Sequence, residues 1–173
     1  MSKRIQKQEI FDLIDQAIGM IKDGQEQITA VSPKTKSGSY DYVNKERIEE
    51  LKQIGDSKYD LKKLIRFCEE LNIDFKNKCY LSTIMVLRAI LNHVPPIFNQ
   101  KNFTEVISNY GGKSFKESMK FLEESSRKIA DGVCHEVIRG KEVLPNETQV
   151  DFSNNLDQLL AEIYRILGIK DSE

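Results

Sequence analysis

The chain has 173 residues, of which 39% are hydrophobic and 31% are charged, and its formal net charge is −1. This length suits one domain or one domain with an appended arm, and the composition suits helices with long charged faces. The near-neutral charge removes the simplest argument for nucleic-acid binding, a broad basic field. The sequence has neither a signal core nor an apolar run that suits a membrane span, so we expect a cytoplasmic protein without membrane contact.

Cysteine and histidine are too sparse to suggest a metal site. Cys68, Cys79 and Cys134 form no C-x-x-C pair, and His93 and His135 are the only histidines. A structural zinc site needs four ligands, usually in closely spaced pairs. We therefore expect reduced, mostly buried thiols, with no metal and no cofactor.

Residues 1–43 are expected to form an N-terminal amphipathic helix and a flexible linker. Between Ile5 and Ile28, apolar residues recur at helical spacing and make one stripe: Ile10, Phe11, Ile14, Ile18 and Ile21. The stretch that follows is polar and without period, and it holds Pro33 and Gly38. The helical bundle domain is then expected over residues 44–173.

The middle of the chain predicts three helices, over about 44–54, 57–71 and 75–93. Asp74 is expected to cap the third of them. The third helix is apolar around most of its girth, which places it at the centre of a bundle. Its apolar residues are Tyr80, Leu81, Ile84, Met85, Leu87, Ile90 and Leu91.

Prolines and capping residues mark the next helix boundaries. Pro95 and Pro96 offer no N–H and should end the helix before them. Segments 102–105 and 114–117 both have the form of a capping box, and they predict helix starts on either side of Gly111-Gly112.

Two long amphipathic helices are expected in the C-terminal third, from 115 to about 140 and from 152 to 167, with a turn at 144–146. In the first we expect Met119, Phe121, Leu122, Ile129, Val133 and Val137 to point inward. Only 143–150 has a weak strand pattern, which Pro145 opposes. The sequence therefore predicts an all-α protein, a helical bundle of about five main helices with an N-terminal helical arm.

Arg88 and His93 form the first candidate site, at the end of the most apolar helix. Histidine titrates near neutral pH and arginine binds phosphate in a fork, so the pair suits metal-free ribonuclease chemistry. On an ideal helix the two side chains lie about 140° apart. They converge only if the helix loosens before Pro95 or if a second copy supplies half of the site. The alternative is structural: Arg88 pairs with an acidic residue across the bundle, and the helix dipole favours a charged His93.

His135 and Arg139 form the second candidate pair. They are spaced one helical turn apart and would share a face of the helix. If that face lay against the end of the Arg88 helix, histidines and arginines from two helices would line one groove. The alternative is an exposed surface of mixed charge, which the nearby Glu123, Glu124 and Glu136 favour.

The segment Leu87-Arg88-Ala-Ile-Leu-Asn-His93 resembles the R-x(4–6)-H motif of HEPN domains. These are small helical bundles common in bacterial toxins, antiphage systems and RNA-processing enzymes, and many pair as dimers whose two motifs form one metal-independent RNase site. The resemblance implies a phosphate-binding role for Arg88 and a general-base role for His93. Ala89 departs from the polar residue that often follows the arginine in HEPN nucleases. Several members without nuclease activity serve as binding or dimerisation modules.

A wider stretch, from Tyr80 to Phe98 and on through 114–139 and the final helix, resembles uncharacterised bacterial proteins found near mobile elements and defence genes. Two functions are therefore expected. The first is a helical interaction and oligomerisation module, regulatory in a defence or mobile-element setting, whose 5–28 or 156–167 stripe meets a second copy or a partner helix. The second is a HEPN-like RNase that binds RNA and acts as a dimer. Charge balance favours the first, and the arginine–histidine spacing favours the second.

Overall fold

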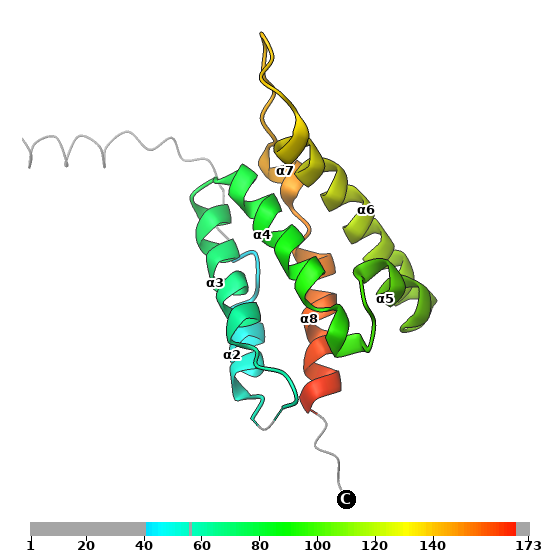
Figure 1. Cartoon of the computed structure of the whole chain (residues 1–173). Coiled ribbons are helices and arrows are strands. Elements are labelled where there is room, and N and C mark those ends of the chain that lie inside the picture. The colour runs from blue at the N-terminus through cyan, green and yellow to red at the C-terminus, as the bar shows by residue number, and fades with distance from the viewer. Residues whose placement is uncertain (1–40, 56, 169–173) are drawn as a thin grey trace, which may run out of the picture. The chain divides into compact units, whose positions relative to one another are not determined.

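The computed structural model describes residues 41–55 and 57–168, and within these the protein is an all-α bundle without strands (Figure 1). The longer helices are α2 (Lys45–Gln53), α3 (Lys62–Lys76), α4 (Tyr80–His93), α6 (Lys113–His135) and α8 (Ser153–Gly168). Three short ones are the 3-10 turn η1 (Pro95–Phe98), α5 (Phe103–Asn109) and α7 (Glu147–Val150). The predicted bundle of about five main helices is confirmed. The predicted arm lies outside the described residues.

Helix α4 makes the central contacts of the bundle. It packs against α3 and α6 and also touches α7 and η1. Four of its aliphatic side chains are fully buried, Ile84, Leu87, Ile90 and Leu91, and so is Thr83. The opposite side of the helix is not covered in the same way, because Leu81, Ser82 and Asn92 remain exposed. The helix is therefore a core helix with one face open to solvent.

The stretch Tyr80–Phe98 is, by length and composition alone, long and apolar enough to cross a membrane, with a mean hydropathy of 1.3. We expected no such run. Half of the stretch is buried inside the bundle, where its apolar side chains form the core. Packing therefore accounts for its composition. As predicted, the two prolines end α4, and they form the first turn of η1.

The boundary between α3 and α4 differs from the prediction. Helix α3 continues to Lys76, so Phe75 is its last inward residue and Asp74 lies inside α3. The chain turns at Asn77–Cys79, where Lys78 adopts a left-handed φ of 59°. The Asp74 carboxylate accepts a hydrogen bond from the Ser82 hydroxyl. It thus links the two helices instead of capping the second.

Only some of the other helix ends are capped by the residues that the sequence predicts. Asn102 caps α5 as predicted, because its side chain accepts a hydrogen bond from the Glu105 amide at 2.9 Å. Ser114 does not cap α6, which already begins at Lys113. A capping box that we did not predict joins Asn146 and Gln149 and starts α7. This short helix occupies part of the weak strand pattern.

The core begins earlier than residue 44. Tyr42 and Val43, expected in the linker, are both buried. The Tyr42 hydroxyl donates to the Val150 carbonyl at 2.8 Å and accepts from the Phe152 amide at 2.9 Å. This one hydroxyl ties the start of the described chain to the connection between α7 and α8.

All three cysteines are free, as expected, but only Cys68 is buried. Burial, and to a smaller extent the charge of Glu69, raises the pKa of the Cys68 thiol to about 12. Cys79 and Cys134 are exposed, so the expectation of mostly buried thiols is wrong. The described residues contain no cluster of three or more histidine, cysteine or acidic side chains that could hold a metal ion.

Replacing Ile90 in α4 by alanine should lower the free energy of unfolding by about 2–5 kcal/mol, because the side chain is fully buried and its removal leaves a cavity. Ile73 offers a matched control on α3, where 54% of the residue is exposed. Ile73→Ala should cost less than about 1 kcal/mol. Urea denaturation followed by circular dichroism measures both. Equal effects would contradict the place of α4 in the core.

Candidate functional site

Arg88 lies on α4 and faces α6, where its guanidinium group donates to Glu123 Oε1 at 3.2 Å. Arg127, one turn further along α6, donates to the same oxygen through Nε at 3.0 Å. The side chains of Arg88 and Glu123 are only 16% and 5% exposed. Arg88 is thus held in an ion pair between α4 and α6. This is the structural alternative for Arg88, in which it pairs with an acidic residue across the bundle.

Glu123 corrects one expectation about the surface of α6. The sequence placed it with Glu124 on a solvated face, but Glu123 is buried and Glu124 is exposed. Its second oxygen, Oε2, is also buried and receives no hydrogen bond within the described residues. A buried carboxylate is costly unless it is paired, so the two arginines are what makes this position tolerable.

His93 is the last residue of α4 and faces α3. Its ring meets the Phe67 ring edge-on, with centroids 6.0 Å apart. Partial burial and, to a smaller extent, the charge of Lys63 lower the pKa of the imidazole. In the structural alternative the helix dipole favours the charged form, whereas the pKa of His93 is lowered, mainly by desolvation. His93 therefore keeps a neutral imidazole to lower pH than an exposed histidine.

Arg88 and His93 do not converge within one copy of the chain. Helix α4 stays regular through its last turn, where the Val94 amide still donates to the Ile90 carbonyl at 3.1 Å. The helix therefore does not loosen before the prolines. One side chain points to α6 and the other to α3, and a joint site would require a second copy.

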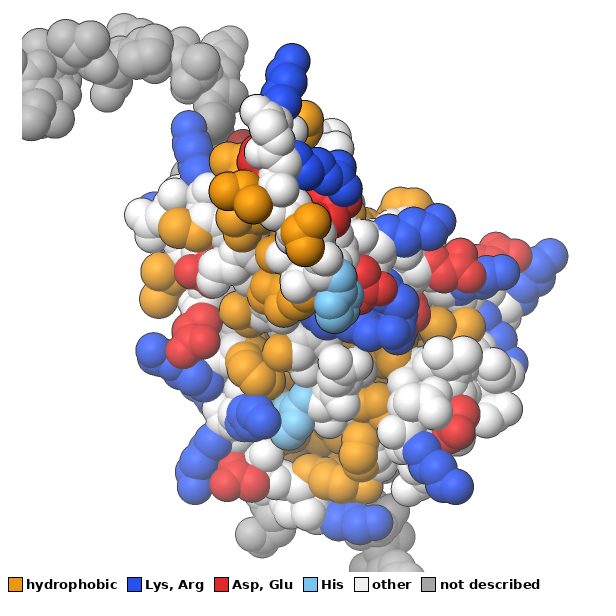
Figure 2. Space-filling view, turned by 45° about the horizontal axis from the view of Figure 1, so that its top comes forward, with side chains coloured by type: hydrophobic (Ala, Val, Ile, Leu, Met, Phe, Trp, Pro, Cys, Tyr) orange, Lys and Arg blue, Asp and Glu red, His pale blue; other side chains and the backbone are white. Residues whose placement is uncertain are grey.

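The second candidate pair is not formed as predicted. Helix α6 ends at His135, and the backbone of Glu136 is extended, with ψ of 128°. Arg139 therefore lies in the following loop, where it pairs with Glu136 at 3.1 Å, so the two residues share no helix face. Figure 2 shows both histidines of the chain on one face of the molecule, separated by other side chains. They do not meet in one groove.

The segment that follows α6, residues 136–146, carries a cluster of exposed aliphatic side chains. We call this segment the apolar loop. Val137 is 80% exposed, Ile138 93%, Val143 87% and Leu144 69%. The loop extends from the end of α6 beyond the bundle and returns to α7 (Figure 1). Solvent thus meets four large aliphatic side chains on one short segment.

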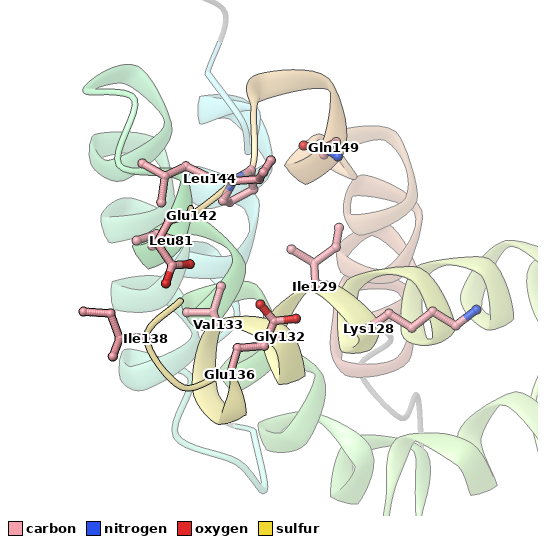
Figure 3. Close-up of a pocket in the computed structure, with 12 residues that line it drawn as sticks. Leu81, Lys128, Ile129, Gly132, Val133, Glu136, Ile138, Glu142, Leu144 and Gln149 are labelled. Carbon is pink, nitrogen blue, oxygen red and sulfur yellow. The ribbon is translucent and has the colours of Figure 1, made fainter. Parts of the chain in front are cut away.

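A groove runs beside the apolar loop, between the start of α4 and the end of α6 (Figure 3). Its volume is about 470 Å³, and we call it the apolar groove. Leu81 lines it from α4, Ile129 and Val133 from α6, and Leu144 and Pro145 from the loop. Gly132 also lines it, and the Glu136 side chain lies within 4 Å of the place that a side chain would take there.

Sequence reasoning missed this surface because it extended α6 too far. It counted Val137 as an inward residue of a helix reaching Gly140 and read the rest as a turn or a strand. The signal was present: two aliphatic pairs, Val137-Ile138 and Val143-Leu144, flank the polar stretch Arg-Gly-Lys-Glu. Paired aliphatic residues on both sides of a polar tip suit a projecting loop better than a helix stripe.

Comparison with known proteins gives no match. No family model matches the chain, and neither does any curated protein or solved structure. Function therefore has to be inferred from the side chains and their surroundings.

Replacing Arg88 by methionine should destabilise the protein by about 3 kcal/mol, because it leaves a buried carboxylate with one partner fewer. Arg127→Met serves as the control and should cost less than about 1 kcal/mol, since Arg127 is more exposed and Arg88 stays in place. Adding Glu123→Met to Arg88→Met should restore most of the loss. Urea denaturation measures the three variants, and an unchanged midpoint for Arg88→Met would contradict a stabilising role of this ion pair.

Proposed function

We propose that the chain is a protein-interaction module that binds an aliphatic protein surface with the apolar loop and the apolar groove. The observation that carries this proposal is the exposure of Val137, Ile138, Val143 and Leu144 on one segment. Soluble proteins rarely expose large contiguous apolar patches, and such patches mark interaction sites. Three of these side chains, Ile138, Val143 and Leu144, also line the groove, opposite Leu81 and Val133. Lys128, Glu136 and Glu142 add charged groups to the lining of the groove.

The free energy available at this surface is large enough to matter. Fully burying an exposed valine, leucine or isoleucine contributes about 1.5–3 kcal/mol. Four such side chains therefore offer several kcal/mol that the bundle itself does not use. No core contact explains their composition, whereas a partner that covers them would.

The proposed interaction uses a different segment from the two amphipathic helices that the sequence predicts as partner-binding elements. The 156–167 stripe was expected to meet a partner, but Leu156, Leu159, Leu160 and Ile163 are buried inside the bundle. The 5–28 stripe lies outside the described residues. Within the described residues, the apolar loop takes the place of the 156–167 stripe as the binding element. The resemblance of 80–98 and 114–139 to proteins encoded near mobile elements and defence genes supports a regulatory setting.

Site-specific photocrosslinking in the producing cell tests this function. Val143 is replaced by the photoreactive residue benzoylphenylalanine, and Glu117, an exposed residue of α6, is replaced in the control. A discrete crosslinked product should form from position 143 and not from position 117. If position 143 gives no product, or no more than the control, the interaction function is wrong.

The alternative function is a metal-independent RNase that uses Arg88 and His93, and one observation favours it. A general base must be neutral at the working pH, and partial burial lowers the pKa of His93 in that direction. The two side chains face different helices within one copy. Such a site would therefore combine Arg88 of one copy with His93 of another, as the HEPN resemblance implies.

Labelled RNA incubated in EDTA with the wild-type chain, Arg88→Lys and His93→Ala tests the alternative. Lysine keeps a charge beside Glu123, which limits the loss of stability. Each variant alone should be inactive, and mixing the two should restore part of the cleavage, because a mixed pair keeps one complete site. Arg66→Ala, an exposed arginine of α3, is the control and should cleave normally. Absence of metal-independent cleavage by the wild-type chain would sink the RNase.

A further inference from the structure

We infer that residues 41–44, which we call the strap, control the apolar loop by holding its C-terminal anchor in place through the Tyr42 hydroxyl. This inference rests on the proposed interaction function and adds a controlling contact to the same surface. The strap precedes α2 and the loop follows α6, so the contact joins distant parts of the sequence. Tyr42 and Val150, which meet in it, are 108 residues apart.

The C-terminal end of the apolar loop depends on the bundle for its position. The loop leads into α7, a helix of only four residues (Glu147–Val150). A single helical turn is not stable by itself, because the cost of ordering it is repaid by few backbone hydrogen bonds. The capping box of Asn146 and Gln149 is local and does not join α7 to the other helices. Contacts with the bundle therefore decide where α7 and the end of the loop lie.

Two tyrosine hydroxyls donate to α7 from other parts of the bundle. Tyr80 reaches the exposed Glu147 carboxylate at 3.3 Å, whereas Tyr42 reaches the buried Val150 carbonyl at 2.8 Å. The buried Phe152 amide also donates to the Tyr42 oxygen at 2.9 Å. Removal of the Tyr42 hydroxyl would deprive a buried carbonyl and a buried amide of these hydrogen bonds, which is costly. Tyr42 is therefore the stronger of the two anchors.

The strap is itself fastened to α3. The Val43 amide donates to Asn72 Oδ1 at 2.7 Å, and Asn72 Nδ2 donates to the Val43 carbonyl at 2.9 Å. The Tyr42 ring meets the Phe75 ring edge-on, with centroids 5.0 Å apart. One residue thus joins α3 to the connection between α7 and α8.

The anchor lies next to the lining of the apolar groove. Gln149 lines the groove and immediately precedes Val150 (Figure 3). Leu144 and Pro145 line the same side from the end of the loop. A shift of α7 away from the strap would move these residues, whereas the walls that α4 and α6 contribute would stay in place. Release of the strap would therefore change the shape of the groove and the position of the loop.

Hydrogen exchange of the full chain, followed by mass spectrometry, tests the anchor. Tyr42→Phe keeps the ring beside Phe75 and removes only the hydroxyl. Backbone amides of residues 147–152 should exchange about 10-fold faster, whereas those of α4 should not change. Asn72→Ala loosens the strap without altering the tyrosine and should act in the same direction, even if Tyr42→Phe fails to fold. Tyr59→Phe is the matched control, since the Tyr59 hydroxyl donates to the Pro96 carbonyl beyond the other end of α4.

Photocrosslinking from position 143, repeated in the Tyr42→Phe and Tyr59→Phe chains, tests control of the surface. Tyr42→Phe should lower the yield of the crosslinked product by about 3-fold or more, because apparent affinity falls with the fraction of molecules whose surface is intact. Tyr59→Phe should leave the yield unchanged.

The two readouts separate failure of this inference from failure of the proposed function. Unchanged exchange in residues 147–152, or equally faster exchange in α4, overturns the anchor. Faster exchange with an undiminished yield of product overturns control by the strap and leaves the interaction function standing. A wild-type chain that gives no product overturns the interaction function, and this inference with it.

Discussion

Helix α4 buries four aliphatic side chains completely against its neighbours, and the remaining helices are arranged around that contact. Because α3 and α6 cover its flanks, Arg88 at the edge of the buried face has to meet a side chain of α6. Its open face carries polar and small residues towards solvent. At its first turn, Leu81 remains partly exposed and contributes to the apolar groove. The core contact thus determines where both candidate surfaces can lie.

The ion pair of Arg88 with Glu123 restricts the orientation of α6 against α4. A buried carboxylate loses its partners when its helix rotates, which adds to the resistance of the close-packed core against such a rotation. Glu123 thus acts together with the buried Met119, Leu122 and Ala130 in holding one face of α6 against the bundle. Ile129 and Val133, six and ten residues further along the same helix, line the groove. The orientation of α6 at this ion pair is thus coupled to the position of the groove near the C-terminal end of the helix.

Much of the fold could be predicted because it follows local rules. The spacing of Ile84, Leu87 and Leu91 predicts a core helix, and two prolines predict its end. The missed features depend on contacts that sequence spacing does not contain. Phe75 continues the inward spacing of α3 past a plausible cap, so only packing decides to which helix it belongs. Glu123 resembles any surface glutamate until an arginine from another helix is seen beside it. The end of α6 was misplaced because aliphatic residues continue beyond it.

Both proposed functions require a second protein molecule, either another copy of this chain or a different partner. The two functions place that molecule at opposite ends of α4. A nuclease site needs Arg88 and His93 of different copies, towards the C-terminal end of the helix. The apolar groove lies at the N-terminal end, beside Leu81. The loop beside it has polar contacts of its own: Arg139 pairs with Glu136, and a capping box joins Asn146 and Gln149 at the start of α7. An ordered loop loses less conformational entropy on binding than a disordered one. The groove end of α4 is the better prepared of the two for association, because the loop beside it exposes four large aliphatic side chains.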